Sequence, residues 1–357
     1  MFRIVLRLLA LAVFVVPAAA FAGTAQARTA ADAYTVNPLV SDSSATPAAA
    51  TDPSLVNAWG LSVGPTTPWW VSDNGTNLST LYSGTGAKTP LTVSVPGGPT
   101  GTVFNGSASD FVVSQGAASG ASRFLFATEG GTILGWTPSV NGTVAIVGAD
   151  RSSVGAVYKG LTTANDRLYA TDFHNGRVDV FDSSFKLVTT PGAFTDAKVA
   201  KGFAPFGIQA IGNDIFVTYA KQDAAKHDDV AVPGQAYVDE FTPDGQLVAR
   251  VVNSGQKNAP LNAPWGLALA PAGFGSFGGD LLVGNFGDGR ISAYTQRGSN
   301  WVYKGQLRSA DGMPVVIDGL WALAFGNGSA AGPTDSLYFA AGPSGEQHGL
   351  FGSITAD

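Results

Sequence analysis

The chain has 357 residues, and its 20 lysines and arginines against 26 aspartates and glutamates give a formal net charge of −6 at pH 7. It contains no run of basic residues, so we expect neither nucleic acid nor an anionic membrane surface as a partner. The absence of cysteine excludes disulfides and thiolate metal sites. Forty-six glycines and few charged residues favour short strands joined by tight turns.

The N-terminus has the pattern of a secretory signal peptide. Arg3 and Arg7 precede the apolar stretch LLALAVFVVPAAAFA, which is too short to span a bilayer comfortably, and Ala25-Gln26-Ala27 forms an A-x-A cleavage site. The pattern predicts a signal peptide over 1–27, with cleavage after Ala22 as the alternative. We therefore expect a secreted, extracellular protein without a membrane span after cleavage.

A short apolar sequence centred on a glycine or alanine, typical of a strand, recurs along the remaining chain. Its copies are NAWGLSV (57–63), VYKGLTTA (157–164), APFGIQAI (204–211), NAPWGLALA (262–270) and DGLWALAF (318–325). A second short strand follows each copy after a turn: WWVSD (69–73), RLYATD (167–172), DIFVTYA (214–220), DLLVGN (280–285) and SLYFAAG (336–342). A glycine-rich turn then leads to a third strand, and a further unit at 110–136 reads DFVVS, RFLFATE and TILGW.

These six units, spaced about 45–60 residues apart, predict an all-β fold in which residues 28–357 form a single six-bladed β-propeller. Gly60, Gly160 and Gly207 fit innermost strands that approach one another closely. The last unit ends without a fourth strand, whereas AYTVNPLVS (33–41) has no unit of its own. We expect this segment to close the last blade. A pair of β-sandwich domains would not predict the recurring phrase or the spare strand.

The phrases NAPWGLALAP and RLYATDFHNGRVDVFD resemble blades of NHL- and TolB-like propellers. NPLVSD, NAWGLS, WWVSDNGT and APFGI resemble a conserved, uncharacterised family of exported bacterial proteins that also occurs in plants. The resemblance covers nearly the whole mature chain and implies the fold and export, but it carries over no active site. A more distant similarity to gluconolactonase-like propellers implies calcium as a candidate cofactor.

The turns between the second and third strands of all blades should share one face of a propeller, and they contain all three histidines. The candidate ligand face comprises Asp73, Asn74, Glu129, Asp172, His174, Asn175, His227, Asp228, Asn285, Asp288, Glu346 and His348. Imidazoles with a carboxylate suit a transition metal, with His174, His227, His348 and Asp172 as candidate ligands. Carboxylates and amides alone suit calcium. The alternative is turn chemistry, because Asp, Asn and Gly are the residues that hairpin turns require.

Two further features have open roles. The loop at 221–235, KQDAAKHDDVAVPGQ, is either a lid or recognition loop or a solvated tip. Aromatic residues at the starts of the inner strands either line the central channel or pack in the core between neighbouring blades. They are Trp59, Phe206, Trp265 and Trp321.

No catalytic motif fixes a reaction, so two functions remain. The first is a monomeric binding module for a small molecule, a glycan or a protein. The alternative is a metal-dependent, lactonase-like hydrolase or lyase acting on a small carbonyl substrate, with a divalent cation as cofactor. An enzyme should concentrate its acidic groups near the propeller axis, whereas a binding module can spread them around the rim.

Overall fold

The computed structural model describes residues 33–188, 190–253, 255 and 260–357. The predicted signal peptide lies outside the described residues. Asp32–Asp357 form one compact unit, built almost entirely of short strands. Across the described ranges, no helix combines the length and apolarity that a membrane crossing requires.

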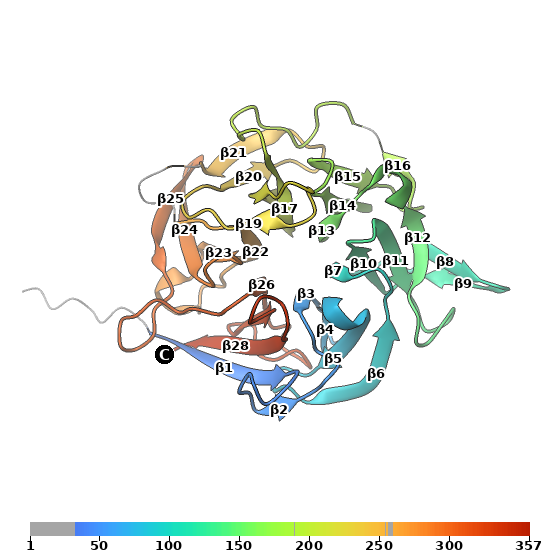
Figure 1. The fold of residues 1–357 in the computed structure, drawn as a ribbon, viewed down its shortest axis with the longest axis horizontal. Helices are drawn as coiled ribbons and strands as arrows, with labels where there is room; N and C mark the ends of the chain where they lie inside the picture. Colours follow the sequence, from blue (N-terminus) through green and yellow to red (C-terminus); the bar gives the residue numbers. More distant parts are fainter. Residues whose placement is uncertain (1–32, 189, 254, 256–259) are drawn as a thin grey trace, which may run out of the picture. The chain divides into compact units, whose positions relative to one another are not determined.

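Six antiparallel sheets stand around one axis, as the repeat predicts (Figure 1). Each sheet has four main strands. The first strands are β3 (Ala58–Ser62), β7 (Pro99–Phe104), β13 (Tyr158–Ala164), β17 (Phe203–Ile211), β22 (Pro264–Leu269) and β26 (Leu320–Phe325). The second strands are β4 (Trp69–Asp73), β10 (Phe124–Thr128), β14 (Arg167–Asp172), β18 (Asp214–Gln222), β23 (Leu281–Asn285) and β27 (Leu337–Ala341).

The outer half of each blade follows the same plan. The third strands are β5 (Leu78–Tyr82), β11 (Thr132–Trp136), β15 (Arg177–Phe181), β20 (Tyr237–Phe241), β24 (Ile291–Arg297) and β28 (Leu350–Ala356). The fourth strands are β6 (Lys88–Ser94), β12 (Ile146–Asp150), β16 (Leu187–Val188), β21 (Leu247–Val252), β25 (Asn300–Gln306) and β1 (Tyr34–Ser41). The smaller elements are β2 (Ala50–Thr51), β8 (Val112–Gln115), β9 (Ala118–Ala121), β19 (Asp229–Val230), η1 (Asn74–Thr76), η2 (Ser152–Val154) and η3 (Gly275–Phe277).

The first strands pack side by side in a closed ring, each beside the first strand of the next blade. Glycine permits this approach. A Cβ atom on Gly60 would collide with the backbone carbonyl of Thr100, and one on Gly207 would collide with that of Trp265. The predicted role of these glycines is therefore confirmed.

The predicted start of the second blade is wrong. The phrase DFVVS at 110–114 does not form the inner strand; β8 (Val112–Gln115), which overlaps it, pairs with β9 in a separate hairpin. The inner strand is β7, which pairs with β10. Gly101 identifies it, because a Cβ atom there would collide with the backbone of Leu161 in the next blade.

The N-terminal strand closes the ring as predicted. β1 runs antiparallel to β28, from the pair Tyr34–Ala356 to the pair Ser41–Leu350. Tyr34 and Val40 are each 1% exposed, so this strand also covers apolar surface. The last blade thus combines the two ends of the described chain.

The connections define two faces. The top face carries the six second-to-third-strand turns and the fourth-to-first connections, because successive strands within a blade are antiparallel. The bottom face carries the first-to-second and third-to-fourth connections. Every residue of the candidate ligand face lies at or beside a second-to-third turn, on the top face.

Candidate functional site

A buried lysine lies at the top of the central channel. Lys159 belongs to the inner strand β13, is 1% exposed, and places its Nζ 5.0 Å from the centre of the Trp59 ring. Trp59 stacks on Trp321 at 3.7 Å, and Trp265 Nε1 donates to the Lys159 carbonyl at 3.2 Å. With Phe206, these aromatic side chains form one buried cluster.

Two carboxylates bind the ammonium group of Lys159. Its Nζ donates to Glu129 Oε1 at 2.5 Å and to Asp228 Oδ1 at 3.3 Å. The other oxygen of Glu129 accepts a hydrogen bond from Asn74 Nδ2 at 2.9 Å, and Asn57 Nδ2 in turn donates to Asn74 Oδ1. The Glu129 side chain is 18% exposed. The first three blades thereby orient one carboxylate at the axis.

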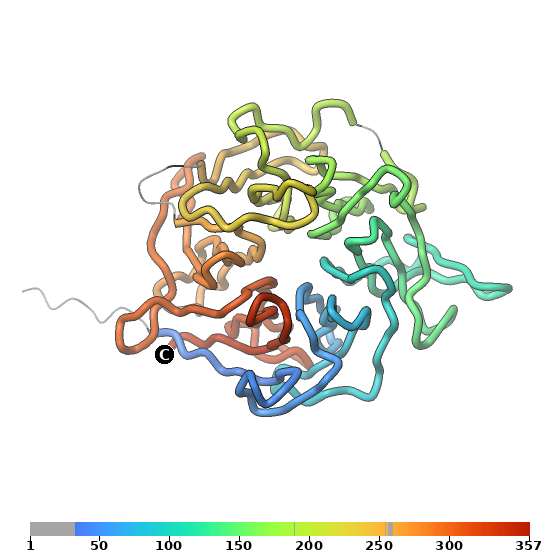
Figure 2. The backbone as a smooth tube through the Cα atoms, viewed as in Figure 1, coloured from blue at the N-terminus to red at the C-terminus, as the bar shows by residue number. Residues whose placement is uncertain are grey.

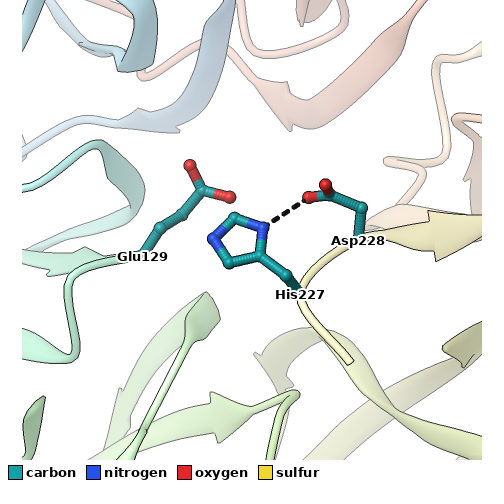
Figure 3. Close-up of side chains that lie close together, drawn as sticks. All are labelled: Glu129, His227 and Asp228. Atoms are coloured by element: carbon teal, nitrogen blue, oxygen red, sulfur yellow. Dashed lines mark hydrogen bonds and ion pairs between the residues drawn. The ribbon is translucent and has the colours of Figure 1, made fainter. Parts of the chain in front are cut away.

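His227 and Asp228 complete this arrangement from the fourth blade. The imidazole Nδ1 donates to Asp228 Oδ1 at 2.8 Å, because an ionised carboxylate can only accept. Figure 3 shows the ring between the carboxylates of Glu129 and Asp228, with its free nitrogen on the Glu129 side. The His227 and Asp228 side chains are 46% and 68% exposed, so solutes can reach them. We call Glu129, Lys159, His227 and Asp228 the axial cluster.

The long loop at 221–235 carries this pair to the axis. Lys221 pairs with Val230 and Gln222 with Asp229, so the loop folds back as a short hairpin. The tube in Figure 2 shows this yellow segment lying over the inner strands. The Asp223 carboxylate accepts the backbone N–H of His227 at 2.9 Å and holds the hairpin tip. The loop is therefore folded against the ring and is not a free tip.

Two half-buried carboxyls add to the negative charge around the axial cluster. The pKa of Glu346 is raised to about 7, mainly by burial and also by the negative charges of Glu129 and Asp228, while Lys159 opposes the rise. Burial likewise raises the pKa of Asp229 to about 7, again with Lys159 opposing the rise. If these two carboxyls and those of Glu129 and Asp228 are ionised and His227 is neutral, the single positive charge of Lys159 leaves a net charge of −3 (+1 − 4).

Glu346 should make the fold less stable as the pH rises. A carboxyl with a raised pKa binds more protons in the folded than in the unfolded state, so its contribution is lost between pH ~4.5 and ~7. We expect Glu346→Gln to be more stable than the wild type at pH 8, by about 1 kcal/mol after allowance for its partial exposure. The difference should vanish at pH 4. Urea unfolding at both pH values tests this, and an equal effect at both would contradict it.

The hairpin around His174 serves turn formation. Asp172 is fully buried, and its Oδ1 accepts the backbone N–H groups of Val157 and Asn175 at 3.3 and 3.2 Å. Its Oδ2 accepts the Asn175 amide at 2.7 Å. The half-buried His174 ring lies beside Gly155, at 3.6 Å from the position a Cβ atom would take.

His348 is also held outside the axial cluster, by Asp42. Its Nδ1 lies 2.8 Å from Asp42 Oδ2, and the second oxygen of Asp42 accepts the Gly349 N–H. In the described part of the chain, His227 is the histidine that joins a group with metal-binding spacing, together with Glu129 and Asp228. The structure therefore does not bring the three predicted histidine ligands together, because His348 is held by Asp42 and His174 lies beside Gly155, each at its own turn.

Other members of the candidate ligand face stabilise their own blades. Asp73 is fully buried and accepts a hydrogen bond from Thr80. Asn285 Nδ2 donates to the Pro260 carbonyl at 2.8 Å and to Asp288 Oδ1 at 3.1 Å. These contacts are the turn chemistry that was the alternative interpretation.

Comparison with known proteins places the chain in a family. No family model matches it. It is 33% identical over 344 residues to the uncharacterised protein L690 of Acanthamoeba polyphaga mimivirus, an alignment that covers 92% of this chain and 88% of that protein. It is 32% identical to the uncharacterised mimivirus protein R648, over 92% of this chain and 82% of that one.

The chain belongs to the family of these two viral proteins. The bacterial and plant relatives and the export suggested by the sequence remain predictions.

Solved structures share the fold at low sequence identity. A streptogramin B lyase has a TM-score of 0.52 at 11% identity, over 91% of this chain and 98% of that one. The aldose sugar dehydrogenase of Escherichia coli has a TM-score of 0.52 at 12% identity, over 91% and 100%. At this identity the likeness shows a propeller fold and does not identify a reaction.

Proposed function

We propose that the axial cluster binds one divalent cation and, beside it, a small carbonyl compound on which the protein acts as a hydrolase or lyase. The observation that carries this proposal is the convergence of Glu129, His227 and Asp228, whose ligand atoms all lie within 4.8 Å of one another. Convergence near the axis is what distinguishes an enzyme-like site from ligand groups spread around the rim. The solved propellers named above as a lyase and a dehydrogenase indicate that the fold permits catalysis.

The residues present fit a transition metal. One imidazole and two carboxylates are the ligand types that zinc, manganese and iron accept. While His227 Nδ1 donates to Asp228, Nε2 is the imidazole atom free to bind a metal, with Glu129 on the same side; Asp228 would then orient the ring and add negative charge. The excess negative charge around the axis favours binding of a cation, which would offset the repulsion from Glu129 and Asp228 that adds to the effect of burial on the pKa of Glu346.

The protein's own groups suit acid–base chemistry at this position. A bound cation would polarise a substrate carbonyl. Glu346, with a pKa near 7, can accept or donate a proton at neutral pH. Lys159 fixes the position of Glu129, and the exposed side chains of His227 and Asp228 face the incoming solute.

Metal binding tests the proposal directly. The protein should be stripped with a chelator and titrated with Zn²⁺ and Mn²⁺ by calorimetry. We expect one ion per chain, with an affinity that falls as the pH drops through about 6.5, because only neutral imidazole binds metal. His227→Ala should weaken binding at least about 100-fold, in line with the loss of one ligand.

The matched control is His174→Ala, which removes a histidine from the same face but outside the axial cluster. It should leave metal affinity and stoichiometry unchanged. Wild-type stoichiometry below one ion per chain under metal-replete conditions would reject the cation site. One ion per chain without turnover of any lactone or ester in a test panel would favour the binding module for a small molecule, glycan or protein.

A further inference from the structure

The bottom face carries a cavity between the first and second blades. It has a volume of about 620 Å³ and is lined mainly by Trp70 and Leu81 of the first blade and by Phe104, Phe124 and Trp136 of the second. This volume is within the range of small-molecule pockets, about 300–1,000 Å³. Trp70 stacks on Phe124 at 4.0 Å and meets Trp136 at 4.7 Å. The cavity is thus walled by a fixed group of aromatic rings.

At two other blade junctions, the first-to-second connection supplies a buried aromatic side chain. In the second blade, the first-to-second connection supplies Phe111, which is 2% exposed and packs in the cluster shared with the third blade. In the fifth blade the same connection supplies Phe274, which is fully buried against the sixth. In the first blade this connection carries Pro65 and Pro68 and no aromatic residue.

One charged residue borders the cavity. Arg123 is exposed, and its guanidinium lies 5.8 Å from the centre of the Phe104 ring. Among the described residues, this guanidinium makes no ion pair or side-chain hydrogen bond. An unpaired guanidinium beside an apolar wall is complementary to a ligand that joins a carboxylate to a hydrophobic body.

The polar groups of the cavity are too few for a sugar. Thr67 Oγ1 is already engaged with the Gly64 N–H and the Pro68 carbonyl, at 2.8 and 2.9 Å. Trp136 Nε1 donates to the Gly142 carbonyl. A saccharide would leave many hydroxyls unpaired against the aromatic walls, whereas a flat aromatic ring would not.

We propose that this cavity is a binding site for a planar aromatic carboxylate, with the ring against Trp70 and Trp136 and the carboxylate at Arg123. The site lies on the face opposite the axial cluster and is independent of the cation site.

Titration of the full chain with 2-naphthoate, followed by calorimetry and tryptophan fluorescence, tests the proposal. We expect saturable binding that Arg123→Gln weakens about five- to tenfold, as suits a partly exposed charged contact. Arg297→Gln, an exposed arginine on β24, is the matched control and should have no effect. The neutral 2-naphthamide should bind the wild type and Arg123→Gln equally.

A second variant tests the cavity itself. Thr66→Phe places an aromatic side chain in the connection that lacks one, at an exposed position, and should abolish naphthoate binding while leaving the melting temperature unchanged. His227→Ala should bind naphthoate like the wild type. Absence of saturable binding, an unchanged affinity in Arg123→Gln, or tighter binding of glucuronate than of naphthoate would each overturn the proposal.

Discussion

Deleting residues 34–41 should prevent the ring from closing and should lower stability by more than about 5 kcal/mol, on the order of the whole stability of a typical domain. The deletion removes the strand that pairs with β28 along its length and leaves that edge exposed. It also removes the buried side chains of Tyr34 and Val40. Tyr34 packs against Phe274 and Phe277, so the loss extends into the junction with the fifth blade.

Circular dichroism during heating measures this effect. A synthetic peptide of residues 33–42, added to the deletion variant, should restore part of the lost melting temperature if the missing strand is the cause. Thr35→Ala, an exposed position on the same strand, is the control and should stay within about 0.5 kcal/mol of the wild type. A deletion variant that melts within a few degrees of the wild type would show that β1 does not close the ring.

The fold could be predicted because each blade repeats the same physical requirements. Each blade repeats a glycine on its crowded inner strand, a set of apolar strands and a polar turn. The segment that forms β1 matches the strand that is missing from the last blade. The second blade shows where this reasoning stops. Its inner strand, PTGTVF, has the small Thr100 before its glycine where the other copies have a large side chain, so the apolar DFVVS of the adjacent hairpin resembles an inner strand more closely. Gly101 is the feature of the sequence that marks the true inner strand.

The sequence predicts which turns contain the candidate site, but not which of their side chains meet. Topology places His174, His227 and His348 on one face, but sequence spacing does not reveal which side chains converge. Convergence depends on the path of the loop at 221–235, which folds inward and carries His227 and Asp228 towards Glu129 of a distant blade. The other two histidines remain in their own blades.

Lys159 could not be recognised from the sequence, because lysine is rarely buried and the surrounding phrase VYKGLTTA predicts an ordinary inner strand. Its position before Gly160, where other copies carry Trp59, Phe206 or Trp265, was the available signal. The aromatic residues at this position pack around the axis, so a lysine there places a charge in the same buried layer.

Replacing Lys159 by methionine should therefore destabilise the protein by about 3 kcal/mol at pH 8, because it leaves the largely buried carboxylate of Glu129 without its counter-charge. The unpaired carboxylate should acquire a raised pKa in the folded state. The stability lost on substitution should then be largely recovered as the pH falls and Glu129 takes up a proton. Urea unfolding at pH 8 and pH 5 measures both effects.

Two comparisons separate this charge effect from loss of packing. Combining Lys159→Met with Glu129→Gln should restore most of the stability at pH 8, since the largely buried anion is removed together with the cation and the remaining partner, Asp228, is exposed to solvent. A divalent cation should stabilise Lys159→Met more than the wild type, because it replaces the missing positive charge beside Glu129 and Asp228. A double variant as unstable as Lys159→Met, with no added stability from the cation, would show that Lys159 supports the inner strands by packing alone.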